Sequence, residues 1–153
     1  MFIEIERDEK MIELAIEIAK VAHKEDRYGE KDYFEYHLMN VYRRVEAMVV
    51  DMPKEFAVAA KVVAILHDIH EDHDYPLAEI EMLFGKEVRD AVEAISFKKE
   101  VESREEYYER VLGNKIAIVV KRADASENMF NCELDGDKKD RVAYYDKIVK
   151  MMK

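Results

Sequence analysis

Apolar residues recur at helical spacings along most of the chain. Near the amino terminus, residues 8–24 carry apolar side chains three and four positions apart, at Met11, Leu14, Ala15, Ile18 and Val21. This spacing lines one face of an amphipathic helix. A second helix, over residues 33–50, is predicted from the stripe formed by Phe34, Leu38, Val41, Val45 and Met48. The polar segment between them, EDRYGEKD, contains Gly29 and is predicted to be a loop.

The middle of the chain contains its most apolar helix. Met52-Pro53 breaks the preceding pattern, since proline suits a first helical turn but not a helix interior. The next helix, predicted over residues 54–70, contains FAVAAKVVAIL and is apolar almost all round, which is typical of a buried central helix. Tyr75-Pro76 marks a turn, and Gly85 is a plausible C-cap for a short helix over 77–84.

The remaining segments also favour helices, predicted over residues 86–97, 104–112, 115–131 and 138–152. The run IAIVV at 116–120 has strand propensity, but it continues into KRADASENMF without a turn signal and therefore favours a helix. A length of 153 residues suits one domain, so the pattern predicts a single all-α domain over residues 1–153.

Composition narrows the class of protein. Hydrophobic residues make up 49% of the chain, which is too many for a disordered protein. Four glycines and two prolines are too few for a turn-rich all-β architecture. Cys132 is the single cysteine, so an intrachain disulfide is excluded and a reducing cytosol is expected.

The charge balance bears on partners and location. The formal net charge is −10, which argues against a nucleic-acid polymer or an anionic membrane as partner but leaves room for a phosphorylated small molecule at a local cationic or metal site. The amino terminus, MFIEIERDEK, is too acidic for a signal or transit peptide, and we find no apolar stretch long enough to span a membrane. These features predict a cytoplasmic protein, whereas the oligomeric state is not predicted.

The segment ILHDIHEDHDYP, residues 65–76, carries the most informative polar cluster. Glu71 and Asp72 each follow His67 and Asp68 by one helical turn. A solvated acidic helix end would explain the cluster, but carboxylates there oppose the helix dipole, and unpaired charge beside a buried helix is costly. A bound cation would relieve both costs. The spacing therefore favours a metal or catalytic site over a solvated end.

The other candidates are weaker when taken alone. Asp124 follows a second apolar run, with Lys121 and Asn128 about one turn away on either side, and a polar seam between packed helices is the favoured interpretation. His23 and His37 border apolar stripes, where a hydrogen-bonded core histidine is commoner than a metal ligand. The remaining two histidines are left open between loop residues and pocket-lining residues; they are His70 and His73.

Taken in order, His37, the pair His67-Asp68 and Asp124 resemble the HD domain superfamily of metal-dependent phosphohydrolases. The resemblance extends to AHKEDRYGEKDYFEYH, LHDIHED, FGKEV and VVKRADASENM. These segments resemble the hydrolase domain of RelA/SpoT-type guanosine tetraphosphate hydrolases and their short single-domain relatives, over roughly His23 to Met129. The fold implied is a single HD-domain helical bundle.

The resemblance also implies a site. The family's four ligands for one divalent metal correspond to His37, His67, Asp68 and Asp124. Its acidic catalytic pair corresponds to Glu71 and Asp72, and its later asparagine to Asn128. Two imidazoles and two carboxylates suit a borderline or hard divalent ion. Mn²⁺ is the family's usual metal, although residue types alone do not separate it from Fe²⁺, Co²⁺ or Zn²⁺. Dinuclear relatives usually carry further histidines between His73 and Asp124, which this chain lacks, so one metal is expected.

The nucleotide-holding loop departs from the family pattern. Arg27 and Lys31 are displaced from the expected basic positions, and Leu38 replaces a proline. We predict that Arg27, Lys31 and Lys121 bind substrate, although solvated loop charge explains the first two equally well. The predicted function is a metal-dependent hydrolase of a phosphorylated nucleotide, with guanosine tetraphosphate or pentaphosphate 3′-pyrophosphohydrolase as the specific candidate. The alternatives are a nucleoside monophosphate phosphatase of the same superfamily and a nucleotide-binding regulatory module without turnover.

Overall fold

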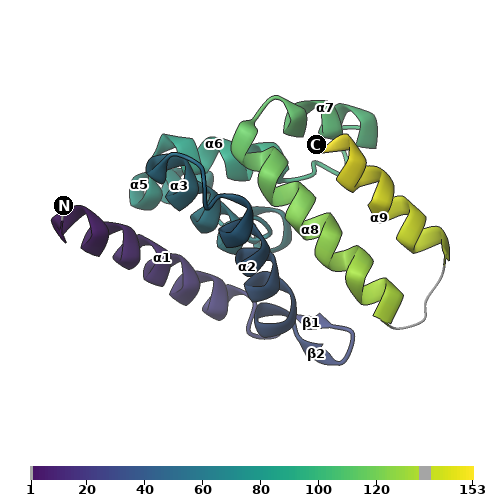
Figure 1. Cartoon of the computed structure of the whole chain (residues 1–153), viewed down its shortest axis with the longest axis horizontal. Coiled ribbons are helices and arrows are strands. Elements are labelled where there is room, and N and C mark those ends of the chain that lie inside the picture. Colours follow the sequence, from purple (N-terminus) through teal and green to yellow (C-terminus); the bar gives the residue numbers. More distant parts are fainter. Residues whose placement is uncertain (1, 135–138) are drawn as a thin grey trace.

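A computed structural model describes residues 2–134 and 139–153, and it is helical apart from one small hairpin (Figure 1). This confirms the predicted all-α class. The elements in chain order are α1 Phe2–Ala22, β1 Arg27–Tyr28, β2 Lys31–Asp32, the π-helical segment η1 Phe34–Leu38, α2 Met39–Met48, α3 Lys54–Leu66, α4 Ile69–His73, α5 Leu77–Phe84, α6 Lys86–Ile95, α7 Arg104–Leu112, α8 Lys115–Leu134 and α9 Lys139–Met151.

Helix α3 forms the centre of the structure. Pro53 precedes it, and every residue from Val62 to Leu66 is buried. Helices α1, α2, α6 and α8 all pack against it, so the side chains of its carboxyl half are covered, whereas Lys54 and Glu55 in its first turn are exposed. This is the arrangement predicted from a segment that is apolar all round. The carboxyl end of α3 therefore delivers the residues that follow it into the interior of the bundle.

Helices α8 and α9 form an antiparallel pair along one side of the bundle (Figure 1). The run IAIVV lies within α8, which confirms the predicted helix and excludes the strand. Cys132 lies on the same helix and is buried and free. Because α8 also packs against α2 and α3, its middle turns face the end of α3.

Several predicted boundaries need correction. Helix α1 begins at Phe2 instead of residue 8, and α8 continues to Leu134 instead of 131. The predicted helix over 54–70 ends at Leu66 and is followed by the separate α4, while the helix predicted over 86–97 ends at Ile95. Residue 138, the predicted start of the last helix, lies outside the described residues. Such shifts are usual because helix ends are set by capping contacts that periodicity does not encode.

The predicted loop over EDRYGEKD contains a two-stranded antiparallel hairpin. Arg27 pairs with Asp32, and Tyr28 pairs with Lys31. Gly29 has a φ of +65°, a conformation that costs a residue with a Cβ, and it allows the chain to reverse direction. The hairpin lies at one end of the bundle, next to the carboxyl end of α1 (Figure 1). It is followed directly by η1, which leads into α2.

No helix within the described ranges combines the length and the apolar character needed to cross a bilayer.

Candidate metal centre

Three segments that are distant in sequence deliver the predicted metal ligands to one place. His37 lies in η1, His67 follows the last residue of α3, and Asp124 lies in the middle of α8. Each of these side chains can offer one ligand atom, and those atoms all lie within 4.8 Å of one another. The structure therefore brings together three of the four predicted ligands. Asp68, the fourth, is the next residue after His67 and is described below.

The imidazole of His67 is oriented by the backbone of its own helix. Its Nδ1 lies 2.7 Å from the carbonyl oxygen of Ala64, so this nitrogen carries the proton and donates it. The other nitrogen, Nε2, is buried and has no hydrogen-bond partner among the described residues. It lies 3.2 Å from an oxygen of Asp68 and 3.5 Å from an oxygen of Asp124. A buried imidazole nitrogen that faces two carboxylates is a set of ligand atoms that fits a cation.

His37 is fixed by aromatic packing and by the opposite carboxylate. Its Nε2 lies 2.9 Å from Oδ1 of Asp124. The rings of Tyr28 and Tyr33 both stack with its imidazole, with centroids 4.9 and 5.1 Å away. His37 also lies in a π-helical segment, a geometry that is rare and that often occurs at functional sites. The hydrogen bond expected of a core histidine is present, and its partner is Asp124, a predicted ligand; the role of His37 as a metal ligand stays a prediction.

The two aspartates respond differently to the shared site. Desolvation of Asp68, followed by repulsion from Asp124, raises the pKa of the Asp68 carboxyl well above its usual range. Desolvation also opposes the ionisation of Asp124, but the charge of Lys121 and the hydrogen bond from His37 hold its pKa well below its usual range. Tyr33 donates its hydroxyl hydrogen to Asp68. Two carboxylates that compete for ionisation in this way gain from a cation placed between them.

The acidic pair occupies the short helix that follows. The amide of Asp72 donates to the carbonyl oxygen of Asp68 at 2.9 Å, so the predicted one-turn separation survives although α3 ends earlier than expected. Glu71 Oε1 accepts a hydrogen bond from the amide of Phe97 at 2.6 Å, which ties this carboxylate to the segment after α6. Desolvation and then the charge of Glu71 raise the pKa of Asp72. A carboxyl group with a raised pKa holds its proton to a higher pH than an ordinary aspartate, which suits a general acid or base.

The other predicted residues lie around this group in different roles. Asn128 Oδ1 accepts the hydroxyl of Tyr28 at 2.7 Å, so it holds the hairpin against α8. Lys121 Nζ lies 3.4 Å from Oδ2 of Asp124, and its side chain is 16% exposed, so it is an ion-pair partner of a ligand. Burial opposes the Lys121 charge, but Asp124 and Tyr107 raise the pKa of the amine.

Arg27 and Lys31 separate onto two surfaces. Arg27 lines an open pocket of about 400 Å³ together with Glu25, Asp26, Tyr33, Asp72 and His73. Lys31 lies over the ring of Tyr36, 5.0 Å from its centroid, in a neighbouring groove that Tyr28 and Phe130 also line. Arg27 therefore shares a pocket with Asp72 of the acidic pair, whereas Lys31 does not line that pocket.

Sequence reasoning missed the two tyrosines that support the site. Tyr28 lies within the segment predicted to be a loop and Tyr33 directly follows it, and neither falls on a helical apolar stripe. Tyr33 reaches Asp68 and His37, while Tyr28 reaches Asn128 and His37. The sequence feature that could have identified them is their position shortly before His37, where aromatic side chains in or next to a hairpin can pack over a buried imidazole.

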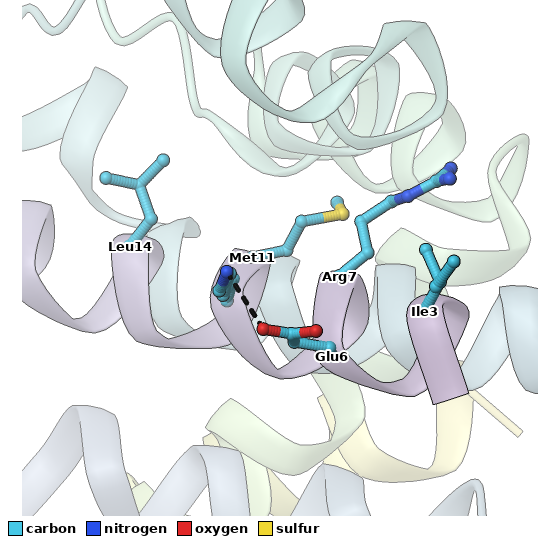
Figure 2. A pocket seen from close by; sticks show the side chains of 6 residues that line it. Ile3, Glu6, Arg7, Met11 and Leu14 are labelled. Atoms are coloured by element: carbon cyan, nitrogen blue, oxygen red, sulfur yellow. Dashed lines mark ion pairs between the residues drawn. The ribbon is translucent and has the colours of Figure 1, made fainter. Parts of the chain in front are cut away.

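A further pocket lies on α1 and has no catalytic composition. It is about 380 Å³ and is formed by a single helix, with Ile3, Arg7, Met11 and Leu14 projecting toward the same side (Figure 2). The dashed line in Figure 2 marks the ion pair between Glu6 and Lys10, at 3.1 Å. This is an ordinary pair one helical turn apart on an exposed surface.

Comparison with known proteins adds evidence on the fold. No protein-family model matches the sequence, and no curated protein is similar to it in sequence. A solved structure of a metazoan ortholog of SpoT, which hydrolyses ppGpp and plays a role in starvation responses, is similar in structure with a TM-score of 0.69. The sequences are 22% identical, and the alignment covers 93% of this chain and 83% of the other. At this identity the likeness shows a shared fold, and it confirms the helical HD-domain fold predicted from the motifs.

Proposed function

We propose that this protein is a divalent-metal-dependent phosphohydrolase that acts on a nucleotide. The observation that carries the proposal is the convergence of His37, His67 and Asp124, from three separate segments, beside Asp68. These side chains fit a divalent metal ion, because the Nε2 atom of His67 is buried, has no hydrogen-bond partner among the described residues and faces the carboxylates of Asp68 and Asp124. The shared fold with a ppGpp hydrolase supports the same class of reaction.

The four ligands would hold one divalent ion. Such an ion supplies Lewis-acid polarisation of a phosphoryl oxygen and makes a water nucleophile available at neutral pH. Mn²⁺ is the first ion to test, because it is the usual metal of the family that the motifs resemble. Fe²⁺, Co²⁺ and Zn²⁺ are tested beside it, since two imidazoles and two carboxylates accept these ions as well. Lys121 offsets part of the negative charge of Asp124 and so lowers the repulsion that the ligand set must overcome.

The acidic pair would handle protons. Asp72 lines the open pocket, and its raised pKa suits a group that gives or accepts a proton during attack on phosphorus. Glu71 is held by the amide of Phe97 and would orient the attacking water through its second oxygen. Arg27 lies in the same pocket and would bind a phosphate group of the substrate. Asn128 would position the hairpin through Tyr28 and, with it, the stacked ring of His37.

Guanosine tetraphosphate or pentaphosphate is the specific substrate we propose, with pyrophosphate released from the 3′ position. The test is a panel of nucleotides incubated with Mn²⁺ and the purified protein, with the products identified by chromatography and the Asp124→Asn variant as control. Pyrophosphate release from a guanosine polyphosphate supports the proposal. Orthophosphate release from nucleoside monophosphates favours the phosphatase instead, and tight nucleotide binding without turnover in any divalent metal favours a regulatory module.

A further inference from the structure

A second group of side chains of metal-ligating types lies beside the proposed centre and shares no residue with it. The group consists of His23, Asp26 and His73. His23 follows the end of α1, Asp26 precedes β1, and His73 is the last residue of α4. Tyr33 packs against both groups, because its ring centroid is 5.0 Å from that of His23 and 5.1 Å from that of His37.

The two imidazoles of this group converge on one carboxylate oxygen. His23 Nδ1 lies 2.7 Å and His73 Nε2 lies 2.6 Å from Oδ2 of Asp26. The ring centroids of the two histidines are 4.8 Å apart, and the three donor atoms lie within 4.8 Å of one another. Tetrahedral Zn²⁺ with bonds of about 2.0–2.1 Å separates neighbouring ligand atoms by about 3.3 Å, so small side-chain shifts would suffice to admit an ion.

The group contains one buried side chain, His23, and two partly exposed ones, Asp26 and His73. His23 is fully buried, and its Nε2 has no partner among the described residues, so its polar contacts are confined to the Nδ1 that faces Asp26. Burial also lowers the pKa of His23, which keeps its imidazole neutral as a ligand must be. The side chains of Asp26 and His73 are 31% and 30% exposed and line the pocket that contains Asp72 and Arg27. An ion can therefore reach the group from solvent.

We propose that His23, Asp26 and His73 bind a second divalent transition-metal ion, separate from the centre formed by His37, His67, Asp68 and Asp124. Two imidazoles and one carboxylate suit Zn²⁺, Co²⁺ or Ni²⁺ better than Mg²⁺ or Ca²⁺, which prefer oxygen ligands. Three protein ligands leave a coordination position for water or for an anionic group in the pocket. The expectation of a single metal rested on the interval between His73 and Asp124, which does not include His23 or Asp26.

The alternative is a hydrogen-bonded cluster in which each imidazole donates one proton to Asp26. The two cases differ in metal stoichiometry, which is measured without any substrate. We would prepare the full chain free of metal and titrate it with Co²⁺ and with Zn²⁺ at pH 7.5, by calorimetry and elemental analysis. The variants are His67→Ala, His73→Ala and the double variant. His73 is the ligand to replace because it is partly exposed, whereas replacing the buried His23 would threaten the fold.

The expected result is two equivalents of metal in the unsubstituted protein, one in each single variant and none in the double variant. His70→Ala is the matched control and should keep two equivalents, because His70 Nδ1 bonds the Tyr75 carbonyl and its side chain belongs to neither group. Circular dichroism on each preparation checks folding, and His73→Gln replaces His73→Ala if the latter unfolds. In the His67→Ala background, addition of Zn²⁺ should shift the ¹⁵N resonances of the His23 and His73 rings.

A single equivalent in the unsubstituted protein that disappears in His67→Ala would overturn the second site and leave the proposed function standing. Two equivalents retained in His73→Ala and His73→Gln would overturn it as well. The reverse pattern, one equivalent that is lost with His73 and kept without His67, would support the second site and remove the metal centre on which the proposed function rests. The two proposals therefore fail separately.

Discussion

The Nε2 atom of His37 lies 2.9 Å from Oδ1 of Asp124, although 87 positions separate the two residues in the chain. The contact joins η1 to the middle of α8 near the carboxyl end of α3, so it depends on how these three helical segments pack together. A polar contact of this kind in a helical core is costly unless its groups are satisfied. A cation shared with His67 and Asp68 would satisfy them together, which leads to the first prediction.

Replacing His67 with alanine should abolish catalytic metal binding and nucleotide hydrolysis together. The substitution removes the Nε2 atom that faces Asp68 and Asp124 and leaves those carboxylates without a shared partner. Bound Mn²⁺ measured by elemental analysis and turnover measured on the same preparation should both fall to background. His70→Ala, which removes a histidine from the neighbouring helix outside the ligand set, should retain both. Turnover that survives in His67→Ala with no bound metal would contradict the proposed role.

The sequence predicted the helical elements well where local signals were strong. Helices α5 and α7 begin and end at the predicted residues, because a proline and a glycine bound the first and a capping box at Ser103 and Glu106 starts the second. The hairpin between residues 27 and 32 was missed because its strands are two residues long, which gives no alternating pattern to detect. The π-helical geometry of η1 likewise depends on tertiary packing.

The candidate site was predicted unevenly for a related reason. His67, Asp68, Glu71 and Asp72 occur within two turns, so their grouping follows from helical spacing alone. His37 and Asp124 could be joined to them only through the family resemblance, since residue spacing carries no information about contacts across the bundle. The contribution of Tyr33, whose hydroxyl bonds Asp68, and the convergence of His73 on Asp26 required the folded arrangement of the hairpin.

Metal binding should stabilise the folded protein. In the absence of a cation the carboxylates of Asp68 and Asp124 repel each other, and an ion bound only by the native state adds stability by mass action. At a free metal concentration about 100 times the dissociation constant, the gain in unfolding free energy is about 2.7 kcal/mol. For a chain of this size each kcal/mol raises the melting temperature by about 2–4 °C.

The measurement is a thermal melt in chelator and in saturating Mn²⁺, followed by circular dichroism. The same comparison in His67→Ala serves as control, because any shift that remains there comes from metal bound elsewhere. Identical melting temperatures for the unsubstituted protein under both conditions, at demonstrated saturation, would argue against a preformed site.

Arg27 and Lys31 should differ in their effect on substrate binding. Arg27 shares a pocket with Asp72, whereas Lys31 lies over Tyr36 in the neighbouring groove. If Arg27 binds a phosphate in the ground state and the transition state alike, Arg27→Ala should raise KM by about tenfold or more with little change in kcat. Lys31→Ala is the charge-matched control and should have a smaller effect. Equal KM values for the two variants would show that Arg27 does not bind the substrate and is a solvated surface charge.

The acidic pair offers a test that separates chemistry from metal binding. Glu71 and Asp72 lie one turn beyond His67 and Asp68, and neither belongs to the group whose ligand atoms converge. If one of them transfers a proton, Glu71→Gln or Asp72→Asn should reduce turnover by about 10²–10⁴-fold while bound metal and KM stay near their original values. The amide variants preserve side-chain size. In Glu71→Gln the side-chain carbonyl oxygen can still accept the hydrogen bond from the Phe97 amide, so folding should be unaffected. Metal content and turnover must be measured on the same preparations, because His67→Ala is also expected to be inactive in a simple assay.

Asp72→Asn should show the larger loss of turnover, since the Asp72 carboxyl lines the open pocket and has the raised pKa, while Glu71 already accepts a hydrogen bond from a backbone amide. Near-normal turnover in both variants would remove the pair from the mechanism and leave the metal ligands as the only catalytic groups.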